Sequence, residues 1–269
     1  MIKRILVTQD GSSYGRAALD AGLWLAKGFQ ASLTGLYVVD IVFLEGPFLH
    51  DISASIGFEP LLNFSAKMQE VLLGRGKDIL SSFDEACRSS SVPSESLAVT
   101  GIVTNEICDQ ARLSDLVIVG RKGVNEKFEH GLLGAVTEGV IRKSPRPVLV
   151  VPAEFKAPQN PLLAYDGSPN ASKAMHSAAE WAKALGSPLT VAAVSKEGKA
   201  GEALFEAEKY LKPYGISVKL VPLSGDPPDA MERYARENKH DLIFMGVCRH
   251  PRLIEMVLGS AAEHLIRSL

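Results

Sequence analysis

The sequence predicts two consecutive α/β domains of the doubly wound, Rossmann-like class, each with a ligand site at the strand ends. Short aliphatic and β-branched runs alternate with segments of helical periodicity, which is typical of parallel βαβ units. Four landmarks of the first half return in the same order in the second half. In both halves a strand ends in glycine, and a polar loop then leads to a second glycine before a helical segment. These features together indicate a tandem duplication.

The composition is that of a globular protein and argues against several functional classes. Hydrophobic residues make up 46% of the chain and charged residues 22%, with a net charge of −2. That balance predicts no nucleic-acid partner. No run approaches the ~18 apolar residues of a membrane helix, and the first residues lack a signal-peptide pattern. The three cysteines form no Cys-x-x-Cys pair, which favours a reduced, cytoplasmic setting.

The expected elements of the first half alternate between strand and helix. They are a strand at 2–8, a helix up to residue 28, strands at 32–39 and 97–100, helices at 65–86 and 105–112, a strand at 116–119, a helix at 136–142 and a strand at 148–151. Residues 40–64 carry glycine and proline among large apolar residues and are expected to form an irregular insertion. A lid, a partner contact and a surface loop without a role are all open for it.

The repeat fixes the domain organisation. The paired landmarks are Asp10-Gly11-Ser12 and Asp166-Gly167-Ser168, Val38 and Val194, Gly120 and Gly246, and Gly134 and Gly259. The first two pairs are 156 positions apart and the last two 126 and 125, so the first repeat carries about thirty extra residues. We assign residues 1–152 and 160–269 to the two repeats. A counterpart of the last strand, 148–151, would fall beyond residue 269, so the second repeat lacks its fifth strand or the sequence is cut short.

The landmarks predict a binding crevice. Ligands of doubly wound sheets lie at the carboxyl ends of strands, where the winding reverses. Asp10, Val38 and Gly120 each follow or end a strand, so we expect a base near the Val38 backbone, a sugar and metal near Asp10, and phosphates over residues 120–137. Simpler roles stay open: the glycines could serve turns, Asp10 could cap a helix, and Val38 could belong to the core.

Several catalytic motifs are absent. The chain has no G-x-x-x-x-G-K-[ST] motif, and its first strand is not followed by G-x-G-x-x-G. The six histidines show no metal-ligand spacing, and no G-x-S-x-G element marks a nucleophile. The pattern therefore predicts nucleotide binding without rapid turnover.

These residues resemble the universal stress protein family in tandem form. The resemblance lies in Ile5-Leu6-Val7-Thr8-Gln9-Asp10-Gly11-Ser12, the Asp-Leu-hydrophobic-Gly fourth strand, and Gly-Leu-Leu-Gly-Ala-Val-Thr-Glu ahead of Pro147-Val148-Leu149-Val150-Val151-Pro152. It implies a five-stranded parallel sheet in the order 3-2-1-4-5 with helices on both faces. ATP-binding members hold the base at the backbone ending strand two and the phosphates on glycine-loop amides, and family dimers often join through strand five.

Carried onto the first repeat, the resemblance implies a binding set that departs from the family at Ala135, where a hydroxyl is expected. Thr137 could supply that hydroxyl, or an amide could suffice. The implied set is Thr8, Asp10, Val38, Gly120, Arg121, Gly123, Gly134, Ala135, Val136 and Thr137. Asp10 could also meet Mg²⁺ bound to the nucleotide.

In the second repeat the implied set departs at Arg249, which replaces a glycine. An arginine there could clamp phosphate or block the pocket. The set is Asp166, Val194, Gly246, Arg249, Gly259 and Ser260. We favour the first repeat as the ATP site.

The resemblance therefore implies a cytoplasmic, ATP-binding stress-response regulator that is non-catalytic or hydrolyses ATP slowly. The unmatched strand at 148–151 predicts a homodimer of the tandem chain. The alternative is an interaction module of the same fold that binds a protein or an apolar ligand instead of a nucleotide.

Overall fold

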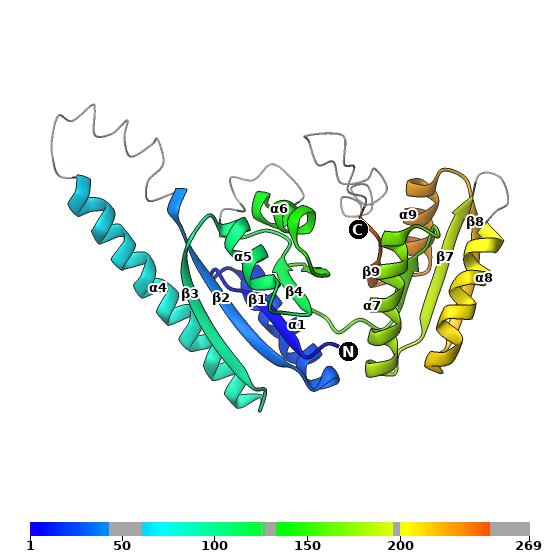
Figure 1. Cartoon of the computed structure of the whole chain (residues 1–269), viewed down its shortest axis with the longest axis horizontal. Coiled ribbons are helices and arrows are strands. Elements are labelled where there is room, and N and C mark those ends of the chain that lie inside the picture. The colour runs from blue at the N-terminus through cyan, green and yellow to red at the C-terminus, as the bar shows by residue number, and fades with distance from the viewer. Residues whose placement is uncertain (43–60, 125, 127–132, 196–199, 248–269) are drawn as a thin grey trace. The chain divides into compact units, whose positions relative to one another are not determined.

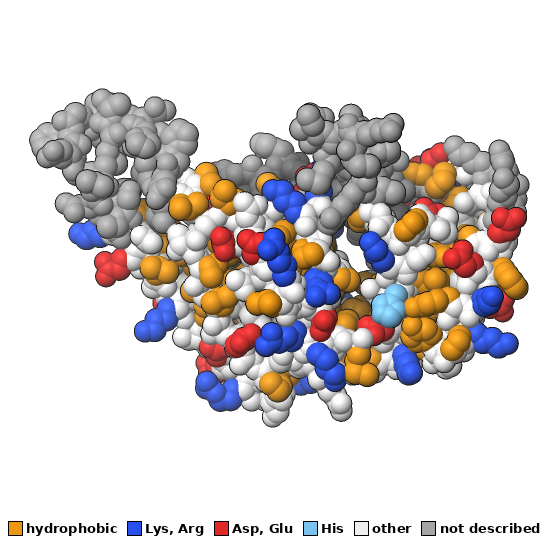
Figure 2. All heavy atoms as spheres, viewed as in Figure 1, with side chains coloured by type: hydrophobic (Ala, Val, Ile, Leu, Met, Phe, Trp, Pro, Cys, Tyr) orange, Lys and Arg blue, Asp and Glu red, His pale blue; other side chains and the backbone are white. Residues whose placement is uncertain are grey.

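The computed structural model describes residues 1–42, 61–124, 126, 133–195 and 200–247, and shows two compact units (Figure 1). One unit comprises Ile2–Phe155, and the other contains the chain from Lys156 onward. No described helix combines the length and the apolar character that crossing a membrane requires. On the face shown in Figure 2, Lys and Arg side chains are interspersed with acidic and apolar ones.

The first unit is built on five parallel strands in the order β3-β2-β1-β4-β5, which confirms the expected order. The strands are β1 (Arg4–Thr8), β2 (Ser32–Asp40), β3 (Ser94–Gly101), β4 (Leu116–Gly120) and β5 (Val148–Val151). Ile5, Leu6 and Val7 are wholly buried, because β1 lies in the middle of the sheet with helices on both faces. The order reverses between β1 and β4, so a crevice is expected at their carboxyl ends.

Helices cover both faces of this sheet. They are α1 (Ser13–Phe29), α4 (Leu61–Ser89), α5 (Val103–Ala111) and α6 (Ala135–Lys143). Tyr37 of β2 packs against α4, which runs along β2 and β3 (Figure 1). Its neighbour Val38 packs with Ile107 of α5 and Val140 of α6. Because successive strand residues point to opposite faces, α4 covers one face and α5 and α6 cover the other.

The second unit repeats this plan with four parallel strands in the order β8-β7-β6-β9. The strands are β6 (Pro161–Ala164), β7 (Leu189–Ser195), β8 (Val218–Ser224) and β9 (Leu242–Phe244). The helices are α7 (Pro169–Leu185), α8 (Ala200–Leu211), the 3₁₀ turn η2 (Lys212–Tyr214) and α9 (Pro227–Glu237). Within the described residues the second sheet has no fifth strand, as the sequence predicts.

The first helix of each unit starts in the same way. The Ser12 hydroxyl accepts a hydrogen bond from the Gly15 N–H at 3.1 Å, and the Ser168 hydroxyl accepts one from the Ala171 N–H at 3.1 Å. Both serines are therefore N-caps that satisfy a helix-end donor. The serine of the repeated Asp-Gly-Ser motif fixes where each helix begins.

The additional length of the first repeat lies between β2 and β3. Residues 43–60, most of the predicted insertion, lie outside the described residues. Helix α4 has 29 residues and its counterpart α8 has 12, so 29 − 12 = 17 extra residues are helical. The buried positions of the two helices match at a constant offset of 124: Gly76, Leu80, Phe83 and Cys87 in α4, and Ala200, Leu204, Ala207 and Leu211 in α8. Since Gly76 matches the first residue of α8, most of the extra helix precedes Gly76.

Candidate functional site

A cavity of about 360 Å³ opens at the carboxyl edge of the first sheet. Residues of β1, β2 and β4 form its floor, and α4, α5, α6 and the loop after β4 form its walls. The sequence-predicted residues that line it are Thr8, Asp10, Val38, Gly120, Gly123, Gly134, Val136 and Thr137. Asp10 and Gly120 therefore lie on one rim, at the place where the strand order reverses.

Asp10 ties the start of α1 to the loop after β4. Its Oδ1 accepts hydrogen bonds from the Ser12 N–H at 2.9 Å and the Ser12 hydroxyl at 2.6 Å. Its Oδ2 accepts one from the Val124 N–H at 3.0 Å. A Cβ on Gly123 would lie 2.8 Å from that same oxygen, so glycine lets the loop approach the carboxylate. A ligand hydroxyl or metal at Asp10 would compete with these bonds.

The backbone of Val38 faces the crevice. The carbonyl of Leu36 accepts a hydrogen bond from the Gln9 N–H at 2.8 Å, so it is turned toward β1. Strand residues two apart turn their N–H and C=O groups to the same side. β1 ends at Thr8, which pairs with Leu36, so the polar groups of Val38 point past the end of β1 into the cavity. A donor and an acceptor are thus presented side by side.

Gly120 serves close packing. A Cβ there would lie 2.5 Å from the Tyr14 Cβ, which belongs to the first turn of α1. At the repeated position, a Cβ on Gly246 would lie 2.5 Å from the Ala171 N in the first turn of α7. Two atoms cannot approach so closely, so both positions require glycine for the first turn of the helix after the neighbouring strand, α1 after β1 and α7 after β6, to pack there.

One of the predicted phosphate donors is used within the protein. The Thr137 hydroxyl is buried and donates to the Gly120 carbonyl at 2.7 Å. The Arg121 N–H donates to the Val151 carbonyl at 2.7 Å, where the loop leaves the sheet. Arg121 and Ala135 are not among the described residues that line the cavity, whereas Lys122 is. Gly134 is the N-cap of α6 and has no side-chain cap, so the first turn of α6 begins at the cavity wall.

Helix α4 contributes residues that sequence reasoning missed. Leu72 and Arg75 line the cavity, together with Tyr37 of β2. The Arg75 Nη2 donates to the Asp10 carbonyl at 3.3 Å. Burial raises the pKa of Tyr37, the charge of Arg75 opposes this and the charge of Asp10 adds to it, so the three groups are close enough to interact. A helical pattern alone does not say which end of a helix reaches a ligand edge, so no sequence signal marked these residues.

The second repeat can be compared over its described part. Asp166 follows β6, and its Oδ1 accepts a hydrogen bond from the Ser168 N–H at 2.9 Å, as Asp10 does from Ser12. Val194 lies near the end of β7 and is partly buried against α9. Gly246 follows β9. Three predicted residues, Arg249, Gly259 and Ser260, lie outside the described residues.

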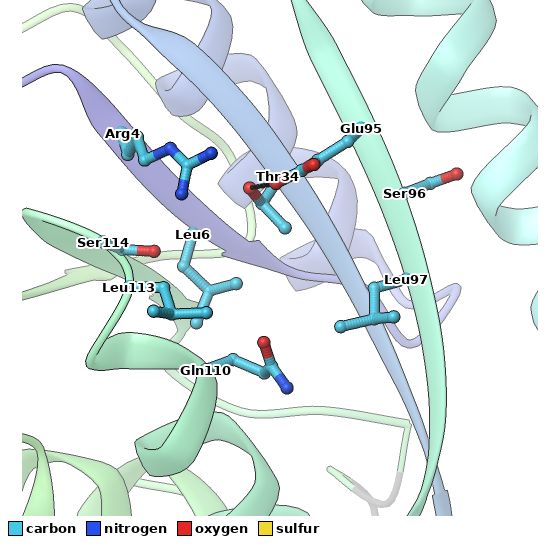
Figure 3. Close-up of a pocket in the computed structure, with 9 residues that line it drawn as sticks. All are labelled: Arg4, Leu6, Thr34, Glu95, Ser96, Leu97, Gln110, Leu113 and Ser114. Carbon is cyan, nitrogen blue, oxygen red and sulfur yellow. Dashed lines mark hydrogen bonds between the residues drawn. The ribbon is translucent and has the colours of Figure 1, made fainter.

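A smaller hollow of about 140 Å³ lies at the opposite edge of the first sheet (Figure 3). Arg4 and Leu6 come from β1, and the Thr34 hydroxyl of β2 donates to Glu95 of β3 at 2.9 Å. No sequence-predicted site residue lines it. The carboxyl edge, where doubly wound sheets bind ligands, therefore remains the candidate site.

Comparisons with known proteins agree with this architecture. The family model described as "Universal stress protein family" matches residues 1–152 and 194–269. A universal stress protein of Synechocystis is 28% identical over 277 residues, which covers 99% of this chain and 96% of that protein. One from Methanocaldococcus jannaschii is 29% identical over 153 residues, which covers 56% of this chain and 82% of that protein.

A solved structure shares the fold over nearly the whole chain. The crystal structure of a universal stress protein from Archaeoglobus fulgidus has a TM-score of 0.77 and 23% sequence identity, and covers 98% of this chain and 94% of that one. The family match spans most of both repeats, and the strand order and repeated landmarks agree with it. The chain belongs to the universal stress protein family.

Proposed function

We propose that the first repeat binds an adenine nucleotide, ATP, in the carboxyl-edge cavity, and that the chain is a stress-response regulator acting through this binding in the cytoplasm. One observation carries the proposal. The backbone of Val38, the carboxylate of Asp10 and the first turn of α6 converge on a single cavity of about 360 Å³. Its volume is within the range of about 300–1,000 Å³ that is usual for small-molecule sites.

The Val38 end of the cavity suits a planar base. A neighbouring N–H and C=O can pair with the donor and acceptor on one edge of adenine. Leu36 and Ile107 line the same region and offer apolar surface to the faces of the ring. Binding through main-chain groups explains why a valine, which has no polar side-chain atom, can stand at a recognition position.

The other end of the cavity suits phosphate. Gly134 and Val136 begin α6 there, and the N-terminal end of a helix carries a partial positive charge. Lys122 adds a full positive charge to the same lining. Among the described residues, no group of three or more His, Cys, Asp or Glu could hold a metal ion, so Mg²⁺ would be carried by the phosphates.

We propose that hydrolysis is slow at most. Both Asp10 carboxylate oxygens accept hydrogen bonds from Ser12 and Val124, which lowers their capacity to activate a water molecule. ATP turnover well above background that requires Mg²⁺ and disappears in Asp10→Ala would overturn this part of the proposal.

One observation favours the second candidate, an interaction module that binds no nucleotide. The Thr137 hydroxyl is hydrogen-bonded within the protein and Arg121 does not line the cavity, so one expected phosphate donor is engaged and another lies outside the cavity lining. An apolar ligand could occupy the part of the cavity lined by Leu36, Ile107 and Leu72. Failure of the wild-type protein to bind any adenine nucleotide would favour this candidate.

The decisive experiment has two parts. Mass spectrometry of molecules released from freshly purified, heat-denatured protein should detect an adenine nucleotide. Titration with ATP, ADP and AMP should then give saturable binding that is lost in Gly123→Val, because a side chain there collides with Asp10 and enters the cavity. Gly201→Val is the matched control, because a Cβ at Gly201 meets no atom within 4 Å. Equal binding by both variants would contradict the assignment to this cavity.

We also propose that two copies of the chain associate through β5. This strand is at the edge of its sheet and pairs with β4 on one side, so its other side presents backbone hydrogen-bonding groups. Val117 and Arg121 of the β4 side donate to the carbonyls of Pro147 and Val151, so the odd-numbered residues of β5 face β4 and the Val150 N–H faces the open edge. Sedimentation should show a dimer that is weakened by Val150→Pro, because proline removes a backbone donor from that edge. A wild-type monomer at all concentrations would overturn the proposal.

A further inference from the structure

Helix α4 packs against β2 at two glycines, and this brings an arginine to the cavity. A Cβ on Gly35 would lie 2.7 Å from the Phe83 ring, and a Cβ on Gly76 would collide with the Tyr37 ring. Glycine at these two positions therefore fixes how deeply the helix lies against the strand. Arg75 directly precedes Gly76, so its backbone is held at the ligand edge by the packing of the core.

The Arg75 guanidinium lies over the Asp10-Gly11 turn. Its Nη2 donates to the Asp10 carbonyl at 3.3 Å and is 3.5 Å from the place where a Cβ on Gly11 would stand. Glycine at position 11, with φ +80°, leaves that space open. The bond to Asp10 uses one of the five N–H donors of a guanidinium. The side chain is exposed and lines the cavity mouth, so the remaining donors can be directed at a ligand.

The charge of Arg75 is not paired with the nearby carboxylate of Asp10. The guanidinium bonds to the main-chain oxygen of that residue, while the carboxylate oxygens accept from Ser12 and Val124. Arg75 and Lys122 therefore bring positive charge to the cavity from two separate elements, α4 and the loop after β4. A planar guanidinium is well suited to phosphate or carboxylate, which it can bind through two parallel hydrogen bonds.

We propose that Arg75 is a ligand-binding residue of the first repeat that contacts an anionic group of the bound nucleotide and sets the preference for phosphorylated over unphosphorylated ligands. The inference rests on the nucleotide site proposed above. In the second repeat the described side chain found beside the equivalent glycine, Gly167, has the opposite charge. The Glu206 Oε2 lies 3.9 Å from the place of a Cβ on Gly167. Lys199, which matches Arg75 in the helix register, lies outside the described residues.

The test measures the affinity of the full chain for adenosine, AMP, ADP and ATP by calorimetry. Wild type, Arg75→Gln and Arg75→Glu are compared with Lys77→Glu, which makes the same charge reversal at an exposed position of the same helix. We expect Arg75→Gln to weaken ATP binding about threefold, as for the loss of an exposed charge contact. Arg75→Glu should weaken it at least about tenfold, because like charges then face each other. Adenosine affinity should be unchanged in all variants.

The outcomes separate the two proposals. A wild type that binds none of the four ligands overturns the nucleotide site, and this inference with it. A wild type that binds ATP while Arg75→Glu and Lys77→Glu behave alike overturns the role of Arg75 and leaves the site intact. Equal loss of adenosine and ATP in Arg75→Glu also overturns it, because the residue then acts through structure and not through phosphate. The Arg75 contribution should also shrink as salt is raised, since salt screens exposed charges.

Discussion

The two repeats fill the same contact between second strand and second helix in opposite ways. In the first repeat Gly35 of β2 faces the large Phe83 of α4. The matching positions in the second repeat hold Val191 and Ala207, which share one buried cluster. The larger side chain of the pair is on the helix in the first repeat and on the strand in the second. What the repeats have in common here is the volume of the pair, because a close-packed interior tolerates exchanges that keep volume and resists those that do not.

A second pair of positions also sets glycine against a large ring in the first repeat, but here the volume of the pair is not kept in the second repeat. Tyr37 of β2 lies against Gly76 of α4, whereas Ala193 and Ala200 take these places in the second repeat. The bulky ring reaches the cavity in the first repeat only, because Tyr37 is part of its lining. Differences that begin as packing choices in the core therefore change which side chains are available at the ligand edge.

The largest expected effect comes from changing the combined volume of Gly35 and Phe83. Gly35→Val should destabilise the first unit by about 2 kcal/mol, because the added atoms overlap Phe83. Gly35→Val combined with Phe83→Ala reproduces the pair of the second repeat and should recover most of that loss. Denaturation by urea can be followed through Trp24 in a Trp181→Phe background, since the chain has two tryptophans, one in each unit. Additive losses in the double variant would contradict volume exchange.

A smaller effect should distinguish the two aspartates. Asp10 holds the Val124 N–H as well as Ser12, whereas Asp166 bonds to Ser168 in the described part of the second repeat. Asp10→Asn should therefore speed hydrogen exchange at the Val124 amide about tenfold, which corresponds to the loss of roughly 1.4 kcal/mol of charge-assisted bonding. Asp166→Asn is the matched control and should leave that amide unchanged. Similar exchange in both variants would show that the loop is held in another way.

The smallest expected effects are opposite pKa changes of two tyrosines. Burial raises the pKa of Tyr37, and the positive charge of Arg75 opposes this because it favours tyrosinate. Burial also raises the pKa of Tyr165, and Glu206 adds to the rise through a hydrogen bond and its negative charge. Arg75→Gln should therefore raise the Tyr37 pKa, and Glu206→Gln should lower the Tyr165 pKa. Titration of ring-labelled tyrosine by NMR measures both pKa values. Changes of the same sign would contradict a positive charge beside Tyr37 and a negative charge beside Tyr165.

Much of this arrangement follows from the sequence. Buried strands alternating with helices, and the repeated Asp-Gly-Ser turn, predict the parallel sheets and bring Asp10, Val38 and Gly120 to one edge. The chemistry of particular groups was harder to predict. Gly120 matches a phosphate motif, yet its lack of a side chain is required by Tyr14. The Thr137 hydroxyl is taken by a carbonyl that is 17 residues away in sequence. Such facts depend on tertiary packing, which a local pattern does not encode.

Arg75 is a residue of the candidate site that the sequence did not predict. The sequence predicts the helix that carries Arg75, but it does not predict that Arg75 lines the cavity. That placement depends on glycines at positions 35 and 76, which let α4 approach β2. A glycine within a helix usually destabilises the helix. Here Gly76 sets the position of the residue before it, and only the partner ring of Tyr37 reveals that.

The register shared by α4 and α8 has a consequence for how such a protein can be altered. Residues 61–75 precede Gly76, the first buried position that α4 shares with α8, so a change of helix length at that end leaves the shared buried positions in place and alters the packing of Met68 and Leu72 beside Tyr37. Each turn added or removed, about 3.6 residues, would move the leading end by roughly 5.4 Å along the helix axis. Selectivity for small molecules could then be changed by altering one helix terminus, while Gly76, Leu80, Phe83 and Cys87 keep the rest of the helix on the sheet.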